Sequence, residues 1–317
     1  MNVFVFGRDG QLGKAFKSLL DSLLLAKDTV IRYVGRADCD LSDEFALNNL
    51  LEQFVPDLII NAAAYTAVDK AETEIALAYA VNARAPELMA IYAAKKGVTL
   101  LHYSTDYVFD GRKEGPYSES DVCAPLGAYG KSKLAGEIAI KNAFANTALG
   151  QYAILRTSWV YGEGENFIRT ILRLARERDQ LRVIYDQRGV PTNAAWLARV
   201  GLDLTLNQNL QLKPFASGIY HAVPNGETTW YGLAKLAIQA ARDSGVALKV
   251  EPDSIVPILA VEYPLPAPKP QNSRLDNSKL YLLMGRESDV TKLQHLNISW
   301  ENDVDMYVRK LAQDGLI

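Results

Sequence analysis

The sequence predicts an α/β protein with a Rossmann-type, doubly wound parallel sheet and a smaller, mixed C-terminal lobe. Short apolar runs rich in β-branched and aromatic residues alternate with helix-like segments from residue 2 to residue 158. A glycine-rich turn, residues 7–13, joins the first apolar run to the first helical segment. Helices between successive strands supply the crossovers that parallel strands require. The regular alternation ends after Tyr161.

The expected elements of the N-terminal part follow a strand and helix rhythm. The apolar run NVFVF predicts a first strand at 2–6, and the spacing of Phe16, Leu20 and Leu23 predicts a helix over 13–25. The other expected strands are 30–34, 57–64, 98–103 and 153–158, and the other expected helices are 43–54, 75–95 and 129–143.

The C-terminal part predicts a less regular arrangement. Prolines recur between residues 252 and 270, which excludes a central strand or a long helix there and predicts an irregular wall of the second lobe. We expect a dinucleotide-binding domain at 1–162, with return segments from 182–223, and a mainly substrate-binding lobe at 163–317. The expected elements are helices near 165–178, 194–206 and 229–243 and strands near 182–185 and 218–223.

Composition and charge exclude several classes of protein. The 317 residues include 34 Lys and Arg against 37 Asp and Glu, a net charge of −3, so nucleic acid and membrane surfaces are not expected partners. No signal peptide is recognised, and no apolar run approaches the roughly 18 residues of a membrane span. Cys39 and Cys123 have no CxxC partner and predict free thiols in a reducing cytoplasm.

The glycine-rich turn predicts binding of a dinucleotide. Gly7, Gly10 and Gly13 directly follow the first strand and open the first helix. Glycines let the backbone approach a pyrophosphate, and the helix N-terminus offers free N–H groups and a positive dipole end. The alternative is a purely structural turn. The GxxGxxG spacing is typical of short-chain dehydrogenase/reductase folds.

The residues after the second strand favour NADPH as the cofactor, with NADH also possible. Folds that prefer NAD usually place an acidic residue there against the ribose hydroxyl, whereas this chain has Gly35 and Arg36. Arg36 is suited to pairing with a 2′-phosphate; the alternative is a solvated loop arginine. Asp40 and Leu41 are expected to flank the adenine.

Tyr129 and Lys133 are the predicted catalytic pair. Positions i and i+4 share a helix face, so the ammonium group is expected to lie beside the phenol and to lower its pKa toward neutrality. Such a tyrosine can protonate an alkoxide as it forms. Thr105 follows a buried strand, at the sheet edge where ligands bind in open α/β folds, and is expected to hydrogen-bond the substrate oxygen. The same Tyr-to-Lys spacing at Tyr92/Lys96 and Tyr231/Lys235 is interpreted as structural.

No metal site is predicted. His102, His221 and His295 are scattered and share no ligand spacing with Cys, Asp or Glu. No Gly-x-Ser-x-Gly elbow, P-loop or HExxH motif occurs, which weakens hydrolase and kinase interpretations.

Motifs along almost the whole chain resemble a known family. They are GRDGQLG at 7–13, NAAAYTAVDKAE at 61–72, STDYVFDG at 104–111, YGKSKLAGE at 129–137, RTSWVYG at 156–162, GVPT at 189–192, GIYHAV at 218–223 and NSRLD at 272–276. The chain thereby resembles the extended short-chain dehydrogenase/reductases, and among them the branch that acts on dTDP-4-dehydrorhamnose. The resemblance implies hydride transfer from NAD(P)H to C4 of dTDP-4-dehydro-β-L-rhamnose, the last step in making dTDP-L-rhamnose for cell-surface polysaccharide.

The resemblance also implies roles for individual residues. Tyr129 and Lys133 would contact the nicotinamide ribose in addition to catalysing. An arginine of the second lobe such as Arg274 is expected to face the substrate diphosphate, and Trp159 or a tyrosine to stack on thymine. Cofactor contacts are implied for Gly10, Gln11, Leu12, Ala64, Tyr65 and Thr66, and substrate contacts for Thr105, Asp106 and Trp159.

Two alternatives and one departure accompany the resemblance. The alternatives are a reductase of another dTDP-4-keto-6-deoxyhexose and a non-catalytic regulatory subunit like the β subunit of methionine adenosyltransferase; the intact Thr105, Tyr129 and Lys133 count against the latter. Some members form dimers through Mg²⁺ held by a glutamate on the first helix, where this chain has Ala15. We therefore expect a monomer or a metal-independent homodimer.

Overall fold

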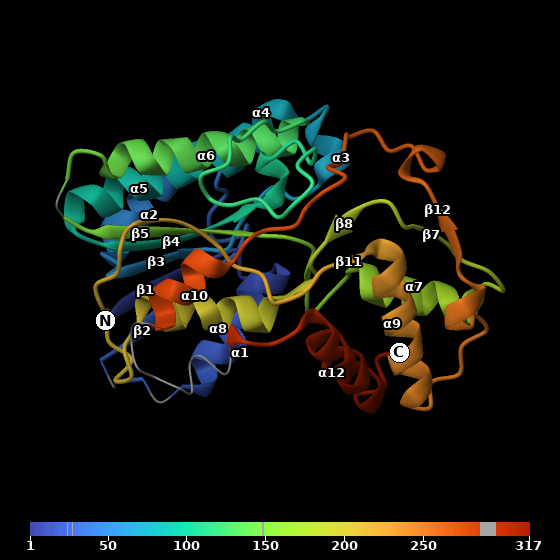
Figure 1. Ribbon diagram of the computed structural model, residues 1–317. Helices are drawn as coiled ribbons and strands as arrows, with labels where there is room; N and C mark the ends of the chain where they lie inside the picture. The colour runs from blue at the N-terminus through green and yellow to red at the C-terminus, as the bar shows by residue number, and fades with distance from the viewer. Residues whose placement is uncertain (24, 27, 148, 286–295) are drawn as a thin grey trace.

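A parallel sheet of six strands forms the centre of one half of the molecule (Figure 1). The computed structural model describes residues 1–23, 25–26, 28–147, 149–285 and 296–317. The strand order is β10-β5-β4-β3-β1-β2, and every neighbouring pair is parallel, which confirms the predicted fold class. The strands are β1 (Asn2–Phe6), β2 (Val30–Val34), β3 (Leu58–Asn61), β4 (Thr99–Thr105), β5 (Gln151–Thr157) and β10 (Gly218–His221).

Helices cover both faces of this sheet because successive side chains of a strand point to opposite sides. In β1, Val3 and Val5 pack with the first helix layer, whereas Phe4 and Phe6 pack with the second. The first layer is α1 (Gln11–Ser22), α8 (Ala194–Thr205) and α10 (Ser278–Gly285), and the second is α2 (Glu44–Phe54), α5 (Ala85–Lys96) and α6 (Ala128–Phe144).

The predicted helix over 75–95 is interrupted by a turn of π-helix. The observed helix consists of α4 (Ile75–Tyr79), the π-helical segment Ala80–Arg84, called the π-turn below, and α5. Within the π-turn, buried Asn82 accepts a hydrogen bond from the Tyr65 N–H at 2.8 Å and donates to the Tyr65 carbonyl at 3.1 Å. The Asn82 carbonyl lies where a Cβ on Gly136 would be only 2.2 Å away, so the glycine lets α6 approach closely. The π-turn thus ties the segment after β3, which contains α3 (Val68–Ala71), to the helix layer.

The other half of the molecule has its own hydrophobic core. This core lies between α7 (Phe167–Glu177), α9 (Trp230–Asp243) and α12 (Trp300–Gln313), the last of which the sequence analysis did not predict. Short strands complete this core. Pro257 lies in β12, which pairs with β7 in a two-stranded sheet and is therefore not a central strand, in agreement with the prediction for residues 252–270. The short strands are β6 (Val160–Tyr161), β7 (Arg182–Ile184), β8 (Arg188–Gly189), β9 (Thr192–Asn193), β11 (Thr228–Thr229) and β12 (Val256–Ile258).

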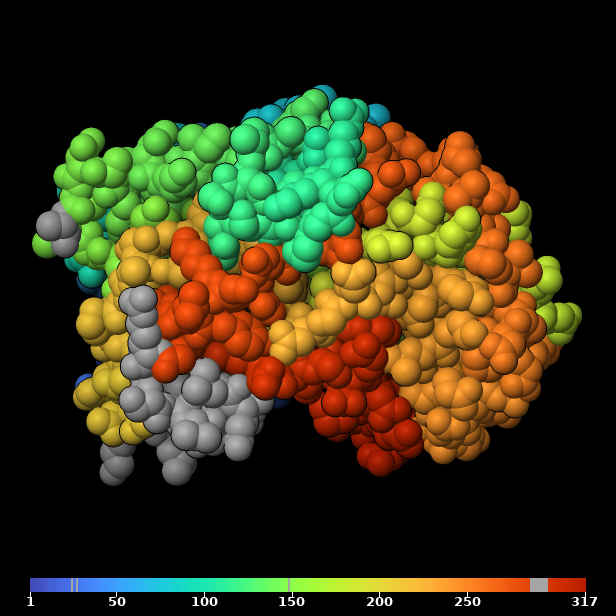
Figure 2. Space-filling view, in the orientation of Figure 1, coloured from blue at the N-terminus to red at the C-terminus, as the bar shows by residue number. Residues whose placement is uncertain are grey.

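Residues on either side of the proposed boundary at 162 connect the two halves. The turquoise-green loop between β4 and α6 lies beside the orange C-terminal chain on the face seen in Figure 2. In that contact the Tyr117 N–H donates to the Arg274 carbonyl at 2.8 Å, and a Cβ on Gly111 would meet Pro270 at 2.6 Å. The division of the chain into 1–162 and 163–317 stays a prediction. Among the described residues, no helix has the length and apolar character needed to cross a membrane.

Candidate active site

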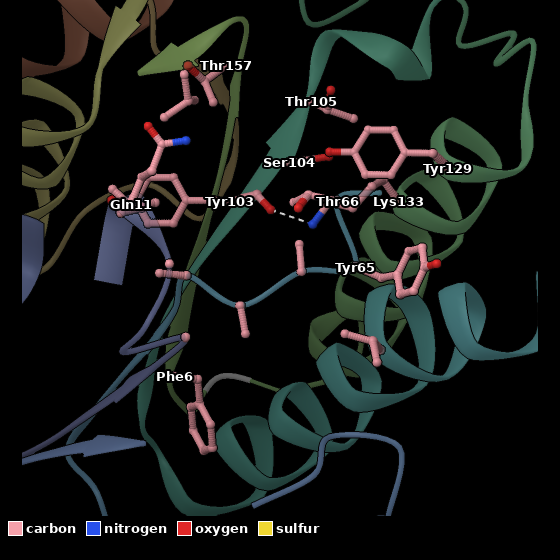
Figure 3. Close-up of a pocket in the computed structure, with 18 of the residues that line it drawn as sticks. Phe6, Gln11, Tyr65, Thr66, Tyr103, Ser104, Thr105, Tyr129, Lys133 and Thr157 are labelled. Atoms are coloured by element: carbon pink, nitrogen blue, oxygen red, sulfur yellow. Dashed lines mark hydrogen bonds between the residues drawn. The ribbon is translucent and has the colours of Figure 1, made fainter. Parts of the chain in front are cut away.

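A cleft of about 630 Å³ opens at the carboxyl ends of the central strands. Its floor is formed where β1, β3, β4 and β5 end (Figure 3). The strand order reverses between β1 and β3, and such a switch point is where open α/β sheets bind ligands. The predicted site residues that line this one cleft are Gly7, Gly10, Gln11, Leu12, Arg36, Asp40, Leu41, Ala64, Tyr65, Thr66, Thr105, Asp106, Tyr129, Lys133 and Trp159.

The glycine turn is built so that its backbone passes close to the cleft. Gly7 has a φ of 87°, in the region that favours glycine, and a Cβ there would lie 2.7 Å from the Ala63 nitrogen. Gly13 does not line the cleft. A Cβ on Gly13 would stand 1.9 Å from the Gly7 carbonyl oxygen, so this glycine allows α1 to pack directly against the turn. The arrangement leaves the N-terminus of α1, which begins at Gln11, facing the cleft.

Arg36 lines the cleft just after β2, which is an edge strand and is separated from β4 by β1 and β3. Its side chain is 78% exposed, and its Nε is 3.7 Å from Asp40, a loose ion pair. The neighbouring Arg8 is instead held by Asp38 at 2.7 Å and by Asp9 at 3.2 Å. Arg36 is therefore the more available of these two cations for an additional anionic partner.

Thr105 and Tyr129 bring two hydroxyl groups together at the end of β4. Figure 3 shows the Tyr129 phenol directed toward Ser104 and Thr105. The Thr105 hydroxyl donates to Oδ1 of Asp106 at 3.1 Å and accepts from the Tyr107 N–H at 3.2 Å. Burial raises the pKa of Tyr129 to about 12, although a hydrogen bond with Thr105 acts in the opposite direction. The predicted lowering of this pKa toward neutrality is therefore wrong for this structure.

The amine of Lys133 is held by strand β4. Its Nζ donates to the Tyr103 carbonyl at 2.6 Å (Figure 3). The same Nζ lies 3.3 Å from Nε2 of His102. The side chain is 1% exposed. Burial lowers the pKa of Lys133 to about 8, and nearby Glu137 opposes this shift. Sequence spacing places the amine on the same helix face as Tyr129, but it does not reveal that strand β4 supplies a backbone acceptor for that amine.

The other two Tyr-to-Lys pairs with this spacing lie outside the cleft. Neither Tyr92/Lys96 nor Tyr231/Lys235 lines the cleft. Their amines form ion pairs, Lys96 with Glu52 at 3.0 Å and Lys235 with Asp253 at 2.7 Å.

A pair of tryptophans forms the wall beyond Tyr129. Trp159 stacks on Trp230 with ring centroids 3.7 Å apart and an interplanar angle of 15°. Trp159 has a φ of 45°, and Gly189 makes room for it, since a Cβ there would lie 2.6 Å from the indole. Trp230 was not foreseen as a site residue because it enters the site from a helix that is distant in sequence. Arg274 does not line the cleft; it pairs with Glu227 at 2.9 Å.

Three buried oxygens in the cleft have no hydrogen-bond partner among the residues that the structure describes. They are Oε1 of Gln11, Oδ2 of Asp106 and Oγ1 of Thr157. Burial raises the pKa of Asp106 to about 6. Since buried polar groups normally have partners, oxygens left unpaired along one cleft fit a polar ligand such as a nucleotide and a hydroxylated sugar. Thr157 was not foreseen from the sequence, although its place at the carboxyl end of a buried strand was a usable signal.

No cluster of three or more potential metal ligands occurs within the described ranges. His102 is buried beneath Lys133, and His221 is buried beside Phe109. His295 lies outside the described residues.

Comparisons with known proteins agree with this geometry. Residues 1–306 match the family model described as RmlD substrate binding domain. The dTDP-4-dehydrorhamnose reductase of Escherichia coli strain K12 is 43% identical over 286 residues, covering 88% of this chain and 90% of that protein. The corresponding protein of Burkholderia thailandensis is 39% identical, covering 90% of this chain and 94% of that one.

Solved structures show the same relationship. A dTDP-4-dehydrorhamnose reductase from Clostridium acetobutylicum superposes with a TM-score of 0.83 at 32% identity, covering 98% of this chain and 99% of that one. The Bacillus anthracis enzyme, solved in complex with NADP, gives a TM-score of 0.81 at 30% identity, with the same coverage. The chain therefore belongs to the dTDP-4-dehydrorhamnose reductase family, whose model is described as the RmlD substrate binding domain.

Proposed function

We propose that this protein reduces the C4 keto group of dTDP-4-dehydro-β-L-rhamnose to give dTDP-β-L-rhamnose, with NADPH as the hydride donor. The observation that carries the proposal is the shared cleft, in which the glycine turn, the paired hydroxyls of Thr105 and Tyr129 and the buried amine of Lys133 face one space. The names of the relatives and the NADP complex of the Bacillus anthracis enzyme support the choice of substrate and cofactor.

The cofactor would be held along the carboxyl edge of the sheet. Gly10, Gln11 and Leu12 would face its pyrophosphate at the N-terminus of α1, and Arg36, Asp40 and Leu41 its adenosine end. Ala64, Tyr65 and Thr66 would lie along its length, and Asn82 holds the backbone of Tyr65. When bound, NADPH supplies the hydride.

The chain's own residues would orient the ketone and supply the proton. Thr105 and Tyr129 would both hydrogen-bond the carbonyl oxygen. With a pKa raised to about 12, the Tyr129 phenol is protonated at neutral pH and can give its proton to that oxygen as it becomes an alkoxide. The ammonium form of Lys133 would stabilise the tyrosinate that results, and Asp106 and Trp159 would contact the sugar nucleotide.

The proposal is tested by mixing the protein with NADPH and enzymatically generated dTDP-4-dehydro-L-rhamnose. We expect NADPH absorbance to fall and dTDP-L-rhamnose to form. Parallel assays with other dTDP-4-keto-6-deoxyhexoses show whether the substrate class is narrower or broader. Copurification with a transferase, together with no NADPH oxidation, would favour a regulatory subunit instead.

Replacing Arg36 with alanine should weaken the binding of NADPH more than the binding of NADH. The exposed guanidinium would pair with the 2′-phosphate, a group that NADH lacks. The loss of one charge-assisted contact corresponds to roughly a tenfold rise in the KM for NADPH, with little change for NADH. Steady-state kinetics with both cofactors measure this. An unchanged KM ratio would remove Arg36 from cofactor selection.

We also propose a monomer or a metal-independent homodimer in a reducing cytoplasm. Ala15 stands on α1 where a metal-bridged dimer would need a glutamate, and its methyl group packs on the core. The cysteines Cys39 and Cys123 are both free, which supports a reducing compartment. Light scattering with and without EDTA should give the same mass, and a dimer that dissociates on chelation would contradict the proposal.

A further inference from the structure

A chain of buried polar groups runs beneath the catalytic lysine. The Ala63 N–H donates to Oδ1 of Asn61 at 3.2 Å, and Nδ2 of Asn61 lies 3.0 Å from Nδ1 of His102. Nε2 of the same ring lies 3.3 Å from Nζ of Lys133. Asn61 and His102 are both 0% exposed, and neither lines the cleft, so they reach the site through Lys133 and through the backbone of Ala63.

The proton positions in this series of hydrogen bonds follow from which groups can donate and which can only accept. A backbone N–H can only donate, so Oδ1 of Asn61 must face Ala63, and the Asn61 amide N–H must point to the imidazole. Nδ1 of His102 is then an acceptor. Burial lowers the pKa of His102 well below its usual value, so the ring is neutral and carries its one proton on Nε2. That N–H points at Lys133.

An N–H directed at Lys133 discriminates between the two forms of the amine. An ammonium group has only donors, so it would face the imidazole N–H as donor against donor. A neutral amine has a lone pair that accepts this N–H and still donates to the Tyr103 carbonyl at 2.6 Å. We propose that Asn61 and His102 are positioning residues that fix the amine of Lys133 and favour its unprotonated form.

The other titratable groups named here do not favour the unprotonated amine of Lys133, so we assign that effect to the imidazole of His102. Glu137, one turn further along α6, favours the ammonium form, but its carboxylate is engaged by Arg156 of β5 at 2.6 and 2.9 Å and by Ser104 of β4 at 2.6 Å. Tyr129, on the same helix, is neutral up to high pH. The side chains from β3 and from the π-turn that face this region, Asn61 and Asn82, are uncharged.

The inference rests on the proposed reductase function for its kinetic consequence. If the ammonium of Lys133 stabilises tyrosinate, activity falls as pH rises through the pKa of Lys133, which burial has lowered to about 8. The imidazole N–H would keep that limit low. An amine that releases its proton near neutral pH can also return a proton to the tyrosinate after each turnover, which an ordinary lysine does less readily.

Asn61→Asp reverses the direction of hydrogen-bond donation through His102, and it changes the shape of the side chain very little. The carboxylate can accept from both the Ala63 N–H and Nδ1–H of His102, so the imidazole proton moves to Nδ1 and Nε2 becomes an acceptor for the ammonium. We expect the alkaline limit of kcat to move up by about one pH unit or more. Asn61→Leu, which adds no charge, should shift the limit in the same direction by less.

Nitrogen-15 NMR of the imidazole rings in the unliganded protein is the deciding measurement, because it requires neither substrate nor turnover. We expect the Nε2–H tautomer for His102 in the wild type and the Nδ1–H tautomer in Asn61→Asp; His102→Gln assigns the signal. An Nδ1–H wild-type ring would overturn the proposal. So would an alkaline limit that moves in Asn61→Asp but not in Asn61→Leu, since charge alone would then explain it. Absence of NADPH oxidation by the wild type would instead contradict the proposed function and leave the tautomer result standing.

Discussion

Tyr129→Phe is expected to lower kcat by about 10²–10⁴-fold, the usual contribution of a positioned general acid. The substitution removes only the phenolic oxygen, which shares a hydrogen bond with Thr105 at the end of β4. The ring still packs edge-on against Tyr107 with centroids 5.5 Å apart, so the helix and the cleft should keep their shape. NADPH titration monitored by fluorescence should give a dissociation constant close to that of the wild type.

A matched control exists in the same layer of helices. Tyr92 has the same spacing to a lysine as Tyr129, but it lies outside the cleft, and its hydroxyl has no hydrogen-bond partner among the described residues. Tyr92→Phe should therefore keep wild-type turnover. Near-normal activity in Tyr129→Phe would rule out the phenol as the proton donor and point to Asp106, whose carboxyl is buried beside it.

Glu137→Gln is expected to destabilise the protein by about 3–5 kcal/mol, because it leaves a buried cation without a counter-charge. Glu137 and Arg156 are 1% and 2% exposed, and they are joined by hydrogen bonds of 2.6 and 2.9 Å. The carboxylate also accepts from Ser104, a residue of the cleft, at 2.6 Å. The pair thus holds β4, β5 and α6 together under the site. Urea unfolding followed by circular dichroism measures the loss.

The exposed pair Arg173 and Glu177 provides the comparison. Their side chains are 58% and 53% exposed, and exposed ion pairs contribute about 0–1 kcal/mol. Glu177→Gln should therefore leave the unfolding midpoint almost unchanged. Equal losses for Glu137→Gln and Glu177→Gln would show that the buried pair is not an important link between the sheet and α6.

The sheet was predictable because the sequence patterns that specify its strands and helices lie within short segments of the chain. Apolar runs bounded by glycine and followed by amphipathic segments predict β1, α1, β2 and α2 with small errors at their ends. The glycine turn could be placed for the same reason. The π-turn at Ala80–Arg84 could not be foreseen, because it depends on Asn82 reaching Tyr65 and on the close approach of Gly136, contacts made across the fold.

The site was predictable in its composition and less so in its electrostatics. Thr105, Tyr129 and Lys133 follow from strand ends and helix spacing, and all three line the cleft. The direction of the Tyr129 pKa shift does not follow, because it depends on burial of the phenol and on the Asp106 carboxyl near it in the folded protein. Trp230 was missed because only tertiary packing brings it against Trp159.

A crystal structure with NADP⁺ and dTDP-β-L-rhamnose tests the central claim most directly. We expect the Tyr129 hydroxyl to lie within hydrogen-bond reach, about 2.6–3.2 Å, of the sugar C4 oxygen, with the nicotinamide on the opposite side of C4. The diphosphate of the cofactor should lie against the glycine turn. A C4 oxygen placed away from Tyr129 and Thr105, or a cofactor bound elsewhere than at this turn, would contradict the account.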